Sequence, residues 1–300
     1  MVHNNNLGNH NESSNQLNCG RLIVKCPDRP GIVAAVSHFL SARDANIMES
    51  TQYSSDPENG TFFIRIEFFC DGLRRKRNQL EQDFAEIADS FSMEYHFTYR
   101  NERKRSAIFV SKEIHCLMEL LWEWQNGDLD TEISLVISNH EEARSVVEPL
   151  GIPFYYIPAN KDIRQQVEQK QIQLLESHQV DLIILARYMQ ILTPGFVERF
   201  PNQIINIHHS FLPAFIGARP YERAFDRGVK LIGATSHYVT NDLDEGPIIE
   251  QDVERVDHRN QVIDLKKTGQ KIERRVLARA VKWHLEDRII VQGNKTIVFQ

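Results

Sequence analysis

The sequence predicts an α/β protein of two domains, a small β-α-β-β-α-β unit followed by a larger unit around a mostly parallel sheet. Three observations support this fold class. The chain has 300 residues, which is enough for two ordinary domains. Its first third has two helical patterns separating short strands in the order of the ferredoxin-like class. After a charged stretch at 100–106, strands that are apolar along their whole length alternate with helices, which favours a parallel sheet covered on both faces.

The first 18 residues, "MVHNNNLGNHNESSNQLN", form a polar tail rich in Asn, Ser and His. Such a segment has too little apolar surface to offset the entropy of ordering, so residues 1–18 are expected to be disordered. The N-terminus lacks the apolar core of a signal peptide, and the sequence has no apolar run long enough to cross a bilayer. These features predict a cytoplasmic protein with no membrane partner.

The first domain is expected to span 19–100. "RLIVKCP" predicts a strand, and the prolines and glycine of "PDRPG" predict the turn after it. "TFFIRIEFF" follows a strand at 46–55 across the turn cluster "DPENG", which indicates a hairpin. Helical spacing of apolar residues precedes and follows this hairpin, and "MEYHFTYR" closes the unit as a strand.

The second domain is expected to span 107–300, after a linker at 101–106. Its pattern predicts a Rossmann-like, mostly parallel sheet. Neither GxGxxG nor GxxxxGK[ST] follows its first strand, which disfavours dinucleotide and P-loop phosphate binding. The expected strands are 107–111, 133–138, the short "PFYYIP", 181–188 and 204–208, and the expected helices are 116–124, 141–150 and 161–178.

Charge and cysteine usage exclude several function classes. The net charge of −6 disfavours nucleic-acid binding, and the basic run 74–77 is typical of a solvated helix face. The four cysteines are scattered, without a CxxC pair. This spacing indicates reduced thiols and no disulfide framework or zinc site. The cysteines are Cys19, Cys26, Cys70 and Cys116.

Polar residues gather at the end of the apolar strand in "IINIHHSFLP" (204–213). Ligands of open α/β sheets bind beyond the carboxyl ends of the strands, and Asn206 and His208 lie there. Because they are two residues apart, strand alternation points both side chains to the same side. Downstream, "NDLDEGP" supplies a carboxylate, either Asp242, Asp244 or Glu245, which faces the same crevice if the two strands are neighbours.

An amide, an imidazole and a carboxylate suit attack on a carbonyl or formyl carbon. The Asn206 amide would hydrogen-bond the developing oxyanion, and His208 would carry the proton between nucleophile and leaving nitrogen. A nearby carboxylate would favour the imidazolium and hold the attacking group. No serine or cysteine is clearly placed as a nucleophile, so water or an amine is expected to attack directly. Ser210, the nearest hydroxyl, is expected to be structural.

Each of these residues has a simpler interpretation. Asn206 would serve equally to satisfy backbone groups at a strand end, and His209 is expected to support the site. His208, His209 and His237 are alternative metal ligands. They lack the helical HExxH spacing, however, and adjacent histidines on a strand point to opposite faces. The sequence therefore predicts no metal site.

The first domain resembles an ACT domain in "CPDRPGIVAAVSHFL" followed by "ANIMESTQYS". Members of that family often bind amino acids between paired copies. The resemblance implies that the turn Asp28-Arg29-Pro30-Gly31 lies near an effector, with glycine or methionine as the candidates. It also implies a homo-oligomer, either a dimer or a tetramer. The alternative is a module that only oligomerises the protein.

The second domain resembles the folate-dependent formyltransferase family in "IINIHHSFLPAFIGARPYERAF" and "GATSHYVTNDLDEGPII". In that family the Asn, the His and the Asp of the L-D-x-G-P element form the catalytic trio, which implies Asn206, His208 and Asp244. "LARYMQIL" (185–192) resembles the family's folate-pocket segment, and backbone of the 240–244 loop is expected to contribute as well. The substrate-binding residues implied by these segments are Met189, Gln190, Leu192, His209, Ser210, Gly217 and Asn241.

Two departures decide which branch of the family the chain resembles. "SKEIHCLMELL" stands where glycinamide ribonucleotide transformylases have a Gly-rich phosphate loop, and the extra module is at the front, whereas methionyl-tRNA transformylases have theirs at the C-terminus. "NIHHSFLPAFIGARPY", with His209 where transformylases usually have proline, resembles the deformylase branch. This resemblance implies hydrolysis of 10-formyltetrahydrofolate to formate and tetrahydrofolate in one-carbon and purine metabolism.

The deformylase resemblance implies no metal or nicotinamide cofactor, because the folate is itself the substrate. Three alternatives stay open at this point. The first is a transformylase that passes the formyl group to an amine. The second is a regulatory folate-binding protein, and the third is a metal-dependent amide hydrolase.

Overall fold

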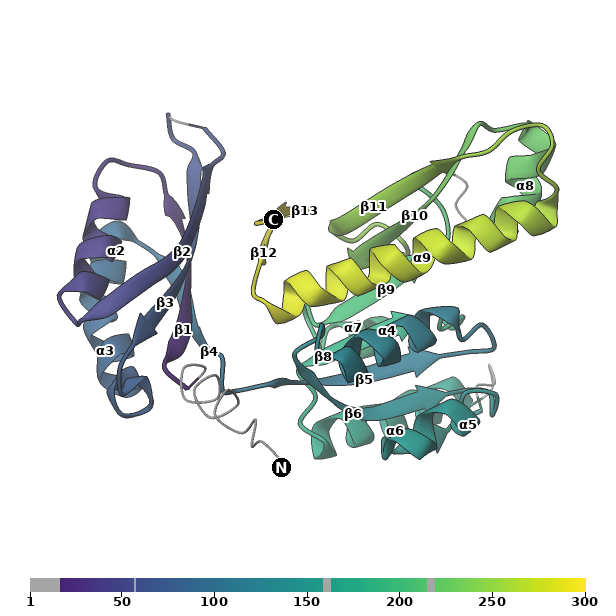
Figure 1. The fold of residues 1–300 in the computed structure, drawn as a ribbon, viewed down its shortest axis with the longest axis horizontal. Helices are drawn as coiled ribbons and strands as arrows, with labels where there is room; N and C mark the ends of the chain where they lie inside the picture. Colours follow the sequence, from purple (N-terminus) through teal and green to yellow (C-terminus); the bar gives the residue numbers. More distant parts are fainter. Residues whose placement is uncertain (1–16, 57, 159–162, 215–218) are drawn as a thin grey trace, which may run out of the picture. The chain divides into compact units, whose positions relative to one another are not determined.

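The computed structural model describes residues 17–56, 58–158, 163–214 and 219–300 (Figure 1). These divide into two compact units, the first ending at Arg103 but including Phe299–Gln300, and the second spanning Lys104–Val298. The first unit has the predicted β-α-β-β-α-β order. Its sheet is antiparallel, with strand order β2-β3-β1-β4. Its elements are β1 (Cys19–Pro27), α2 (Ile32–Ser41), β2 (Ala45–Ser54), β3 (Thr61–Cys70), α3 (Leu73–Phe91) and β4 (Glu94–Tyr99).

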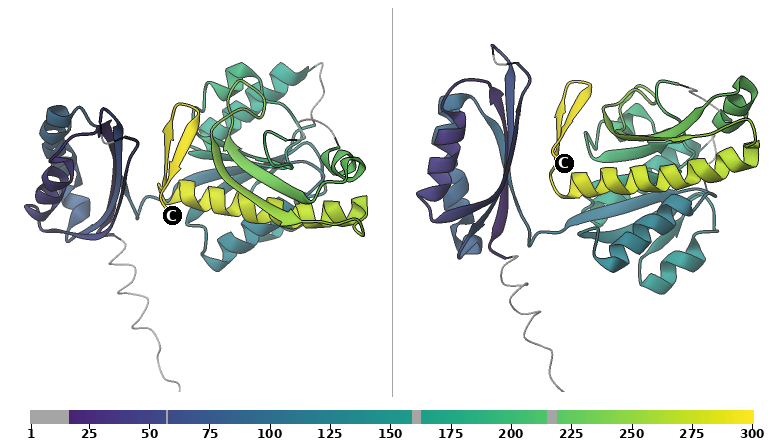
Figure 2. Two further views of the ribbon diagram at one scale, coloured as in Figure 1. Left: turned by 90° about the horizontal axis from the view of Figure 1, so that it is seen from above. Right: turned by 45° about the horizontal axis from the view of Figure 1, so that its top comes forward.

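One face of this sheet carries the core of the first unit. Both helices, α2 and α3, lie on that face (Figure 2). Alternate residues of the central strands, such as Leu22 and Val24 in β1 and Ile64 and Ile66 in β3, are buried against them. This is the period expected of strands with one face covered by helices.

The domain ends differ slightly from those predicted. Residues 1–16 of the expected tail lie outside the described residues. Asn18, in contrast, is tied to the first unit, because its amide donates to Asp71 at 3.4 Å and its carbonyl oxygen accepts from the Cys70 N–H at 2.8 Å. At the other end, β5 already begins at Lys104, so the last three residues of the predicted linker 101–106 belong to a strand.

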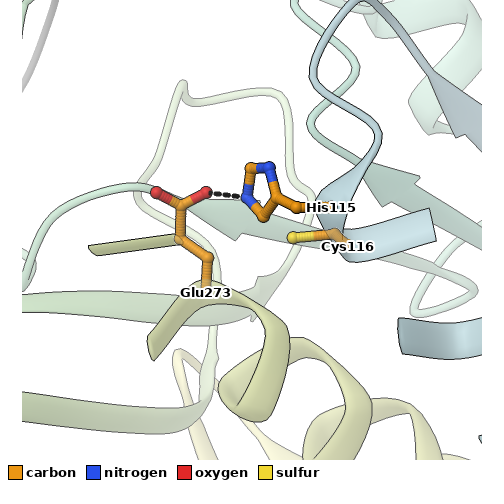
Figure 3. A group of neighbouring side chains, drawn as sticks. All are labelled: His115, Cys116 and Glu273. Carbon is orange, nitrogen blue, oxygen red and sulfur yellow. Dashed lines mark hydrogen bonds and ion pairs between the residues drawn. The ribbon is translucent and has the colours of Figure 1, made fainter. Parts of the chain in front are cut away.

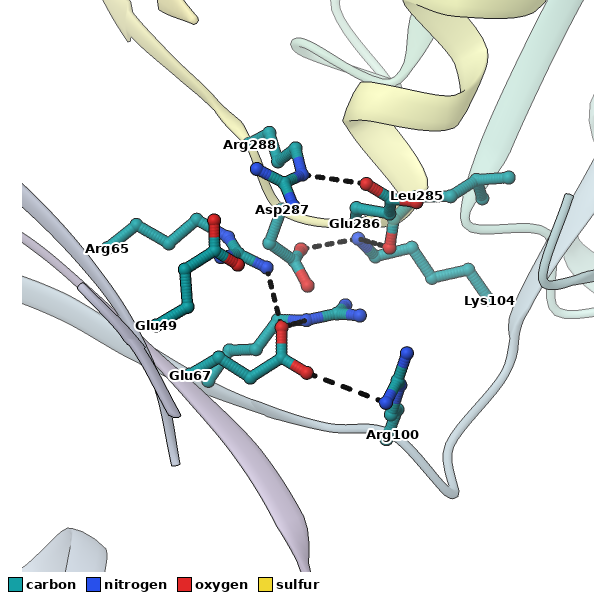
Figure 4. Close-up of polar contacts among 10 residues, drawn as sticks. Glu49, Arg65, Glu67, Arg100, Lys104, Leu285, Glu286, Asp287 and Arg288 are labelled. Carbon is teal, nitrogen blue, oxygen red and sulfur yellow. Dashed lines mark hydrogen bonds and ion pairs between the residues drawn. The ribbon is translucent and has the colours of Figure 1, made fainter. Parts of the chain in front are cut away.

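Charged side chains that are largely buried are paired within each unit (Figure 4). In the first unit, the Arg65 side chain is 1% exposed and pairs with Glu49 and Glu67, each at 3.1 Å. In the second unit, Lys104 pairs with Asp287 beside the end of the long helix α9 (Val262–Leu285). Removal of one partner would leave an uncompensated charge, so each pair fixes its elements together.

The second unit is built on a seven-stranded sheet of order β11-β10-β9-β8-β5-β6-β7. The five strands from β9 to β7 pair in parallel, and β10 is the strand of opposite direction, pairing antiparallel with both β9 and β11 in a mostly parallel sheet, as predicted. Its elements are β5 (Lys104–Val110), α4 (His115–Asn126), β6 (Thr131–Ser138), α5 (Arg144–Val147), η1 (Glu148–Leu150), β7 (Phe154–Tyr156), α6 (Arg164–Ser177), β8 (Leu182–Ala186), α7 (Pro194–Val197), β9 (Ile204–His208), α8 (Pro220–Arg227), β10 (Leu231–Tyr238), β11 (Ile248–Arg255), α9, β12 (Ile289–Gln292) and β13 (Lys295–Val298).

Helices cover both faces of this sheet, which explains its apolar strands. In β5, Ile108 and Val110 join the core beneath α4 and α9, whereas Ala107 and Phe109 join the core beneath α6 and α7. The predicted helix at 141–150 is shorter than expected and continues as the 3-10 turn η1, which contains Pro149. Within the described residues, no helix has the length and apolar character needed to span a membrane.

The topology brings the three candidate segments to one edge of the sheet. The strands β8 and β9 are parallel neighbours, so both end at that edge. The antiparallel strand β10 pairs with β9, with His237 opposite Asn206 and Thr235 opposite His208. Because the strands are antiparallel, β10 ends beside the start of β9, and the loop after it folds back so that Oδ2 of Asp244 lies 3.2 Å from Nδ1 of His208.

Candidate active site

Asn206 and His208 line one cavity of about 570 Å³ at the carboxyl end of β9. Strand alternation predicts this shared side, because the two residues are separated by one position. The His208 side chain is buried, and that of Asn206 is partly exposed. The same cavity is lined by Asp244, so the structure brings together three side chains from two separate segments of the sequence.

Asp244 completes the group from the loop after β10. Its φ of +59° is in the left-handed region, which Asp adopts more readily than most residues with a Cβ. Its Oδ2 lies 3.2 Å from Nδ1 of His208, and its side chain is 12% exposed. Burial opposes ionisation of this carboxyl, but its interactions with His208 and His237 together outweigh it and hold the pKa of Asp244 well below its ordinary value.

The contact with Asp244 leaves the other His208 nitrogen for chemistry. Because the ionised carboxylate can only accept, Nδ1 of His208 is the donor in this pair. Nε2 of His208 is buried and has no hydrogen-bond partner among the described residues. The imidazole is therefore fixed by one nitrogen and available to exchange a proton through the other.

His237 has a role that sequence reasoning missed, since it appeared there only as an alternative metal ligand. Its Nδ1–H donates to the carbonyl oxygen of Tyr238 at 2.9 Å, so its Nε2 accepts from the Asn206 amide at 3.2 Å. Nε2 is also 3.7 Å from Oδ1 of Asp244. This bond fixes the orientation of the Asn206 amide. The sequence indication of this role was the place of His237 in the predicted strand "GATSHYVT", but only the register of β9 and β10 puts His237 opposite Asn206.

Gly246 fixes the path of the loop that carries Asp244. A Cβ at this position would overlap the carbonyl oxygen of Tyr238, which is backbone at the end of β10. The loop closes back on that strand through the Tyr238 N–H, which donates to the carbonyl of Pro247 at 2.9 Å.

Gly246→Ala is expected to lower the free energy of unfolding by about 1–3 kcal/mol, as other overpacked substitutions do. Urea unfolding measures this change. Gly195→Ala is the matched control, because a Cβ at Gly195 meets no atom within 4 Å and its backbone is not in the left-handed region. Equal stability of the two variants would contradict the close approach of the loop to β10.

Most of the predicted folate-contacting residues line the same cavity. These include Met189, whose side chain is largely exposed and whose N–H is held by the Ser111 hydroxyl at 3.1 Å. Asn241 also lines the cavity, and its amide donates to Glu198 at 2.9 Å. The predicted residues that line the cavity are Met189, Gln190, Leu192, His209 and Asn241.

Two other residues were predicted to contact the substrate, and neither is among those that line this cavity in the described structure. Ser210 does not line the cavity that holds Asn206 and His208, and it lines a neighbouring apolar cavity of about 320 Å³. Its hydroxyl donates to the carbonyl of Ala214 at 2.8 Å, as a structural role would require, and its part as a substrate contact stays a prediction. A buried hydroxyl needs such a partner, and the turn supplies it. Gly217 lies outside the described residues.

Strand alternation predicted that His208 and His209 point to opposite faces, but they do not. Their rings stack with centroids 5.3 Å apart, and both line the cavity. The expectation was wrong because β9 ends at His208, so the two-residue period no longer applies to His209. Burial, followed by the positive charge of Arg187, lowers the pKa of His209 to about 4, which keeps this imidazole neutral at pH 7.

The turn predicted to lie near an effector is held by bonds within the first unit. Asp28 accepts from the Ser54 hydroxyl, and Arg29 donates to the carbonyl of Ser90. The Arg29 guanidinium carbon also lies 4.4 Å from the Phe91 ring centroid. Gly31 has a φ of +96°, a conformation that favours glycine.

A second polar group lies beside the cavity (Figure 3). Glu273, on α9, is fully buried and accepts from Nε2 of His115 at 2.7 Å and from the Tyr221 hydroxyl at 2.5 Å. Its Oε2 also lies 3.3 Å from Nε of Arg187. Burial opposes ionisation of Glu273, but the bond from His115 and the charge of Arg187 lower its pKa to about 2.

His115 and Glu273, together with Cys116, have potential metal-ligand atoms that all lie within 4.8 Å of one another. Among the residues that the structure describes, His115, Cys116 and Glu273 are the one such group, and His208, His209 and His237 do not form another. Burial raises the pKa of the Cys116 thiol well above its ordinary value, and Arg187 already neutralises Glu273. The group is thus an internal ion-pair network.

Comparisons with known proteins agree with the two-unit organisation of the chain. The ACT domain family matches residues 20–85, and the formyl transferase family matches residues 104–281. The chain is 68% identical to the formyltetrahydrofolate deformylase of Bacillus subtilis, over 93% of each protein.

Solved structures give the same relation. The chain resembles a formyltetrahydrofolate deformylase from Pseudomonas syringae with a TM-score of 0.91 and 45% identity, over 97% of this chain and 98% of that one. It resembles glycinamide ribonucleotide transformylase 1 from Symbiobacterium toebii with a TM-score of 0.60 and 29% identity, over 66% of this chain and 95% of that one. The deformylase likeness spans both units.

Proposed function

The chain belongs to the formyltetrahydrofolate deformylases of the formyl transferase family, and we propose that it hydrolyses 10-formyltetrahydrofolate to formate and tetrahydrofolate. One observation supports the active site most directly. His208 donates through Nδ1 to the ionised Asp244, and its buried Nε2 has no hydrogen-bond partner among the described residues. His208 and Asn206 line the same cavity. This arrangement suits transfer of a single proton beside a polarised formyl group.

In the proposed reaction, Asn206 donates an amide N–H to the formyl oxygen. Water attacks the formyl carbon and passes a proton to Nε2 of His208, while the Asn206 amide stabilises the negative oxygen of the tetrahedral intermediate. The imidazolium then gives its proton to N10 as the carbon–nitrogen bond breaks. Formate and tetrahydrofolate are the products.

Two further groups prepare these residues. Asp244 supports the imidazolium of His208 through Oδ2, and its other oxygen orients the attacking water. His237 holds the Asn206 amide through the 3.2 Å bond, so that the second amide N–H is directed to the substrate. Every step is supplied by side chains of this chain, so the proposal includes no metal or nicotinamide cofactor.

The folate would occupy the cavity lined by Met189, Gln190 and Leu192 together with the loop around Asn241. Hydrolysis releases tetrahydrofolate from its formylated form, so we place the reaction in the one-carbon supply of purine biosynthesis, in the cytoplasm. We assign the ACT domain an amino-acid effector, glycine or methionine, bound between paired copies of the chain near Asp28 and Arg29. Calorimetric titration with the two amino acids tests this assignment, and no heat of binding with either would contradict it.

The enzyme is expected to release formate from 10-formyltetrahydrofolate with no amine present, in amounts equal to the tetrahydrofolate formed. A coupled formate assay measures this reaction. Prior treatment with a metal chelator is expected to leave the rate unchanged. Formate release that began only after an amine acceptor was added would support a transformylase, and loss of activity with the chelator would support a metal-dependent hydrolase.

A further inference from the structure

Arg187 has an unusual backbone conformation at the edge of the cavity. It follows β8 directly, and its φ of +63° lies in the left-handed region. This conformation costs a residue with a Cβ on the order of 1–2 kcal/mol and ends the strand earlier than the predicted 181–188. Outliers of this kind gather at functional sites, where the surrounding structure holds them in place.

The Arg187 side chain borders the cavity that holds the candidate catalytic residues. The side chain is 11% exposed and lines the same cavity as Asn206 and His208. Its Nε and Nη1 atoms are buried and make no hydrogen bond to the described residues. A guanidinium is always charged and offers its donors in a fixed planar fork. The cavity wall therefore contains a buried cation whose Nε and Nη1 groups are not used in hydrogen bonds to the described residues.

Glu273 holds this cation from the protein side. Its Oε2 is 3.3 Å from Nε of Arg187, and the carboxylate is itself fixed by the Tyr221 hydroxyl and by His115. Figure 3 shows the contact with His115. Because Glu273 is fully buried and accepts from two other side chains, it cannot follow a movement of the arginine. The carboxylate thus acts as an anchor for Arg187.

The charge of Arg187 reaches the catalytic imidazole through its neighbour. Arg187 and His209 line the same cavity, and after burial this charge is the largest cause of the low pKa of His209. The His209 ring in turn stacks on His208. An anion formed beside His208 would therefore meet a buried positive charge on the same cavity wall.

We propose that Arg187 forms an anion subsite that binds the formate product, with Glu273 as its positioning residue. The proposal rests on the proposed hydrolysis, which converts a neutral formyl group into a carboxylate. The two oxygens of formate match two neighbouring N–H donors of a guanidinium. The cation therefore favours the product side of the reaction and the negatively charged intermediate before it.

The test is equilibrium binding of formate to the full-length enzyme saturated with tetrahydrofolate, measured by titration calorimetry. Arg187→Met keeps the length of the side chain and removes its charge. We expect it to weaken formate binding about tenfold or more, as loss of a charged hydrogen bond does. The affinity for tetrahydrofolate alone is expected to change less than about threefold, because no role in folate binding is assigned to the guanidinium.

Arg219→Met is the matched control, because Arg219 lines the same cavity but is exposed. It removes the same charge and is expected to leave formate binding within about threefold of wild type. Arg187→Lys keeps the charge without the fork and is expected to weaken formate binding, which provides a second reading if Arg187→Met does not fold. Unchanged formate binding in the Arg187 variants, or an equal loss in Arg219→Met, would overturn the proposal.

Failure of this inference is distinguishable from failure of the proposed function. Formate binding is measured at equilibrium and does not need turnover. If wild-type enzyme releases formate without an amine but Arg187 variants bind formate normally, hydrolysis stands and the subsite assignment fails. If no formate is released without an amine, the proposed function fails first.

Discussion

Replacing His208 with alanine is expected to lower kcat for formate release by about 10²–10⁴-fold, the range that a positioned general acid or base contributes. The reason is geometric. Nδ1 of His208 is bound to Asp244, and its buried Nε2 has no partner among the described residues, so the ring has one nitrogen for orientation and one for proton transfer. The loss is expected in kcat, because the imidazole acts on the reacting groups and contributes little to folate binding.

The measurement is the steady-state rate of formate release, with the affinity for tetrahydrofolate and the urea midpoint of each variant as folding checks. His258→Ala is the control, since His258 is an exposed histidine in the loop before α9. Added imidazole is expected to restore part of the activity of His208→Ala, an effect that repair of a merely structural defect would not produce. A variant that kept near wild-type kcat would remove His208 from the mechanism.

The edge of the sheet where the site forms was predictable from the sequence. The apolar strand "IINIH" indicated where the parallel sheet ends, and alternation put Asn206 and His208 on one side. Both inferences depend on the local chain alone. The pairing of β9 with β10, on which the approach of Asp244 depended, was stated as a condition and is confirmed.

Other parts of the site could not be predicted, because they depend on contacts between distant segments. His237 acquires its bond to Asn206 only through the register of β9 and β10. The contact between Arg187 and Glu273 joins residues 86 positions apart, one at a strand end and one on α9. The prediction that His208 and His209 point to opposite faces was wrong, since the sequence did not show that the strand ends between them.

The remaining signal for Arg187 was present but ambiguous. A charged residue directly after the apolar strand "LIILA" lies at the binding edge of the sheet, yet charged residues also follow strands in ordinary surface loops. Only burial of its side chain and its contact with Glu273 separate these cases.

Asp244→Asn is expected to lower kcat by about 10²–10⁴-fold, although it changes neither the size of the side chain nor the path of the loop. An ionised carboxylate accepts from Nδ1 of His208 and so keeps the proton on that nitrogen. An amide can instead donate to Nδ1, which selects the tautomer with the proton on Nε2. That tautomer cannot take a proton from water, and the positive charge that forms on the ring loses its partner.

Asp242→Asn removes a carboxylate from the same loop and the same cavity and is the matched control. It is expected to change kcat less than about tenfold, because no role on His208 is assigned to Asp242. If the two variants lost activity equally, the general negative charge of the loop would explain the effect and the specific pair would not.

The pH dependence of Asp244→Asn tests whether the wild-type Asp244 is ionised over the whole working range. The pKa of Asp244 is depressed in the folded protein, so the stability it contributes is fully present above the ordinary aspartate pKa of about 4 and is lost only as the pH falls through the folded value. The wild-type carboxylate is therefore ionised throughout the range from about pH 5 to pH 9. Measured across that range, the loss of kcat is expected at every pH. A deficit that disappeared at one end would mean that Asp244 itself titrates there, which contradicts its hydrogen bond to His208.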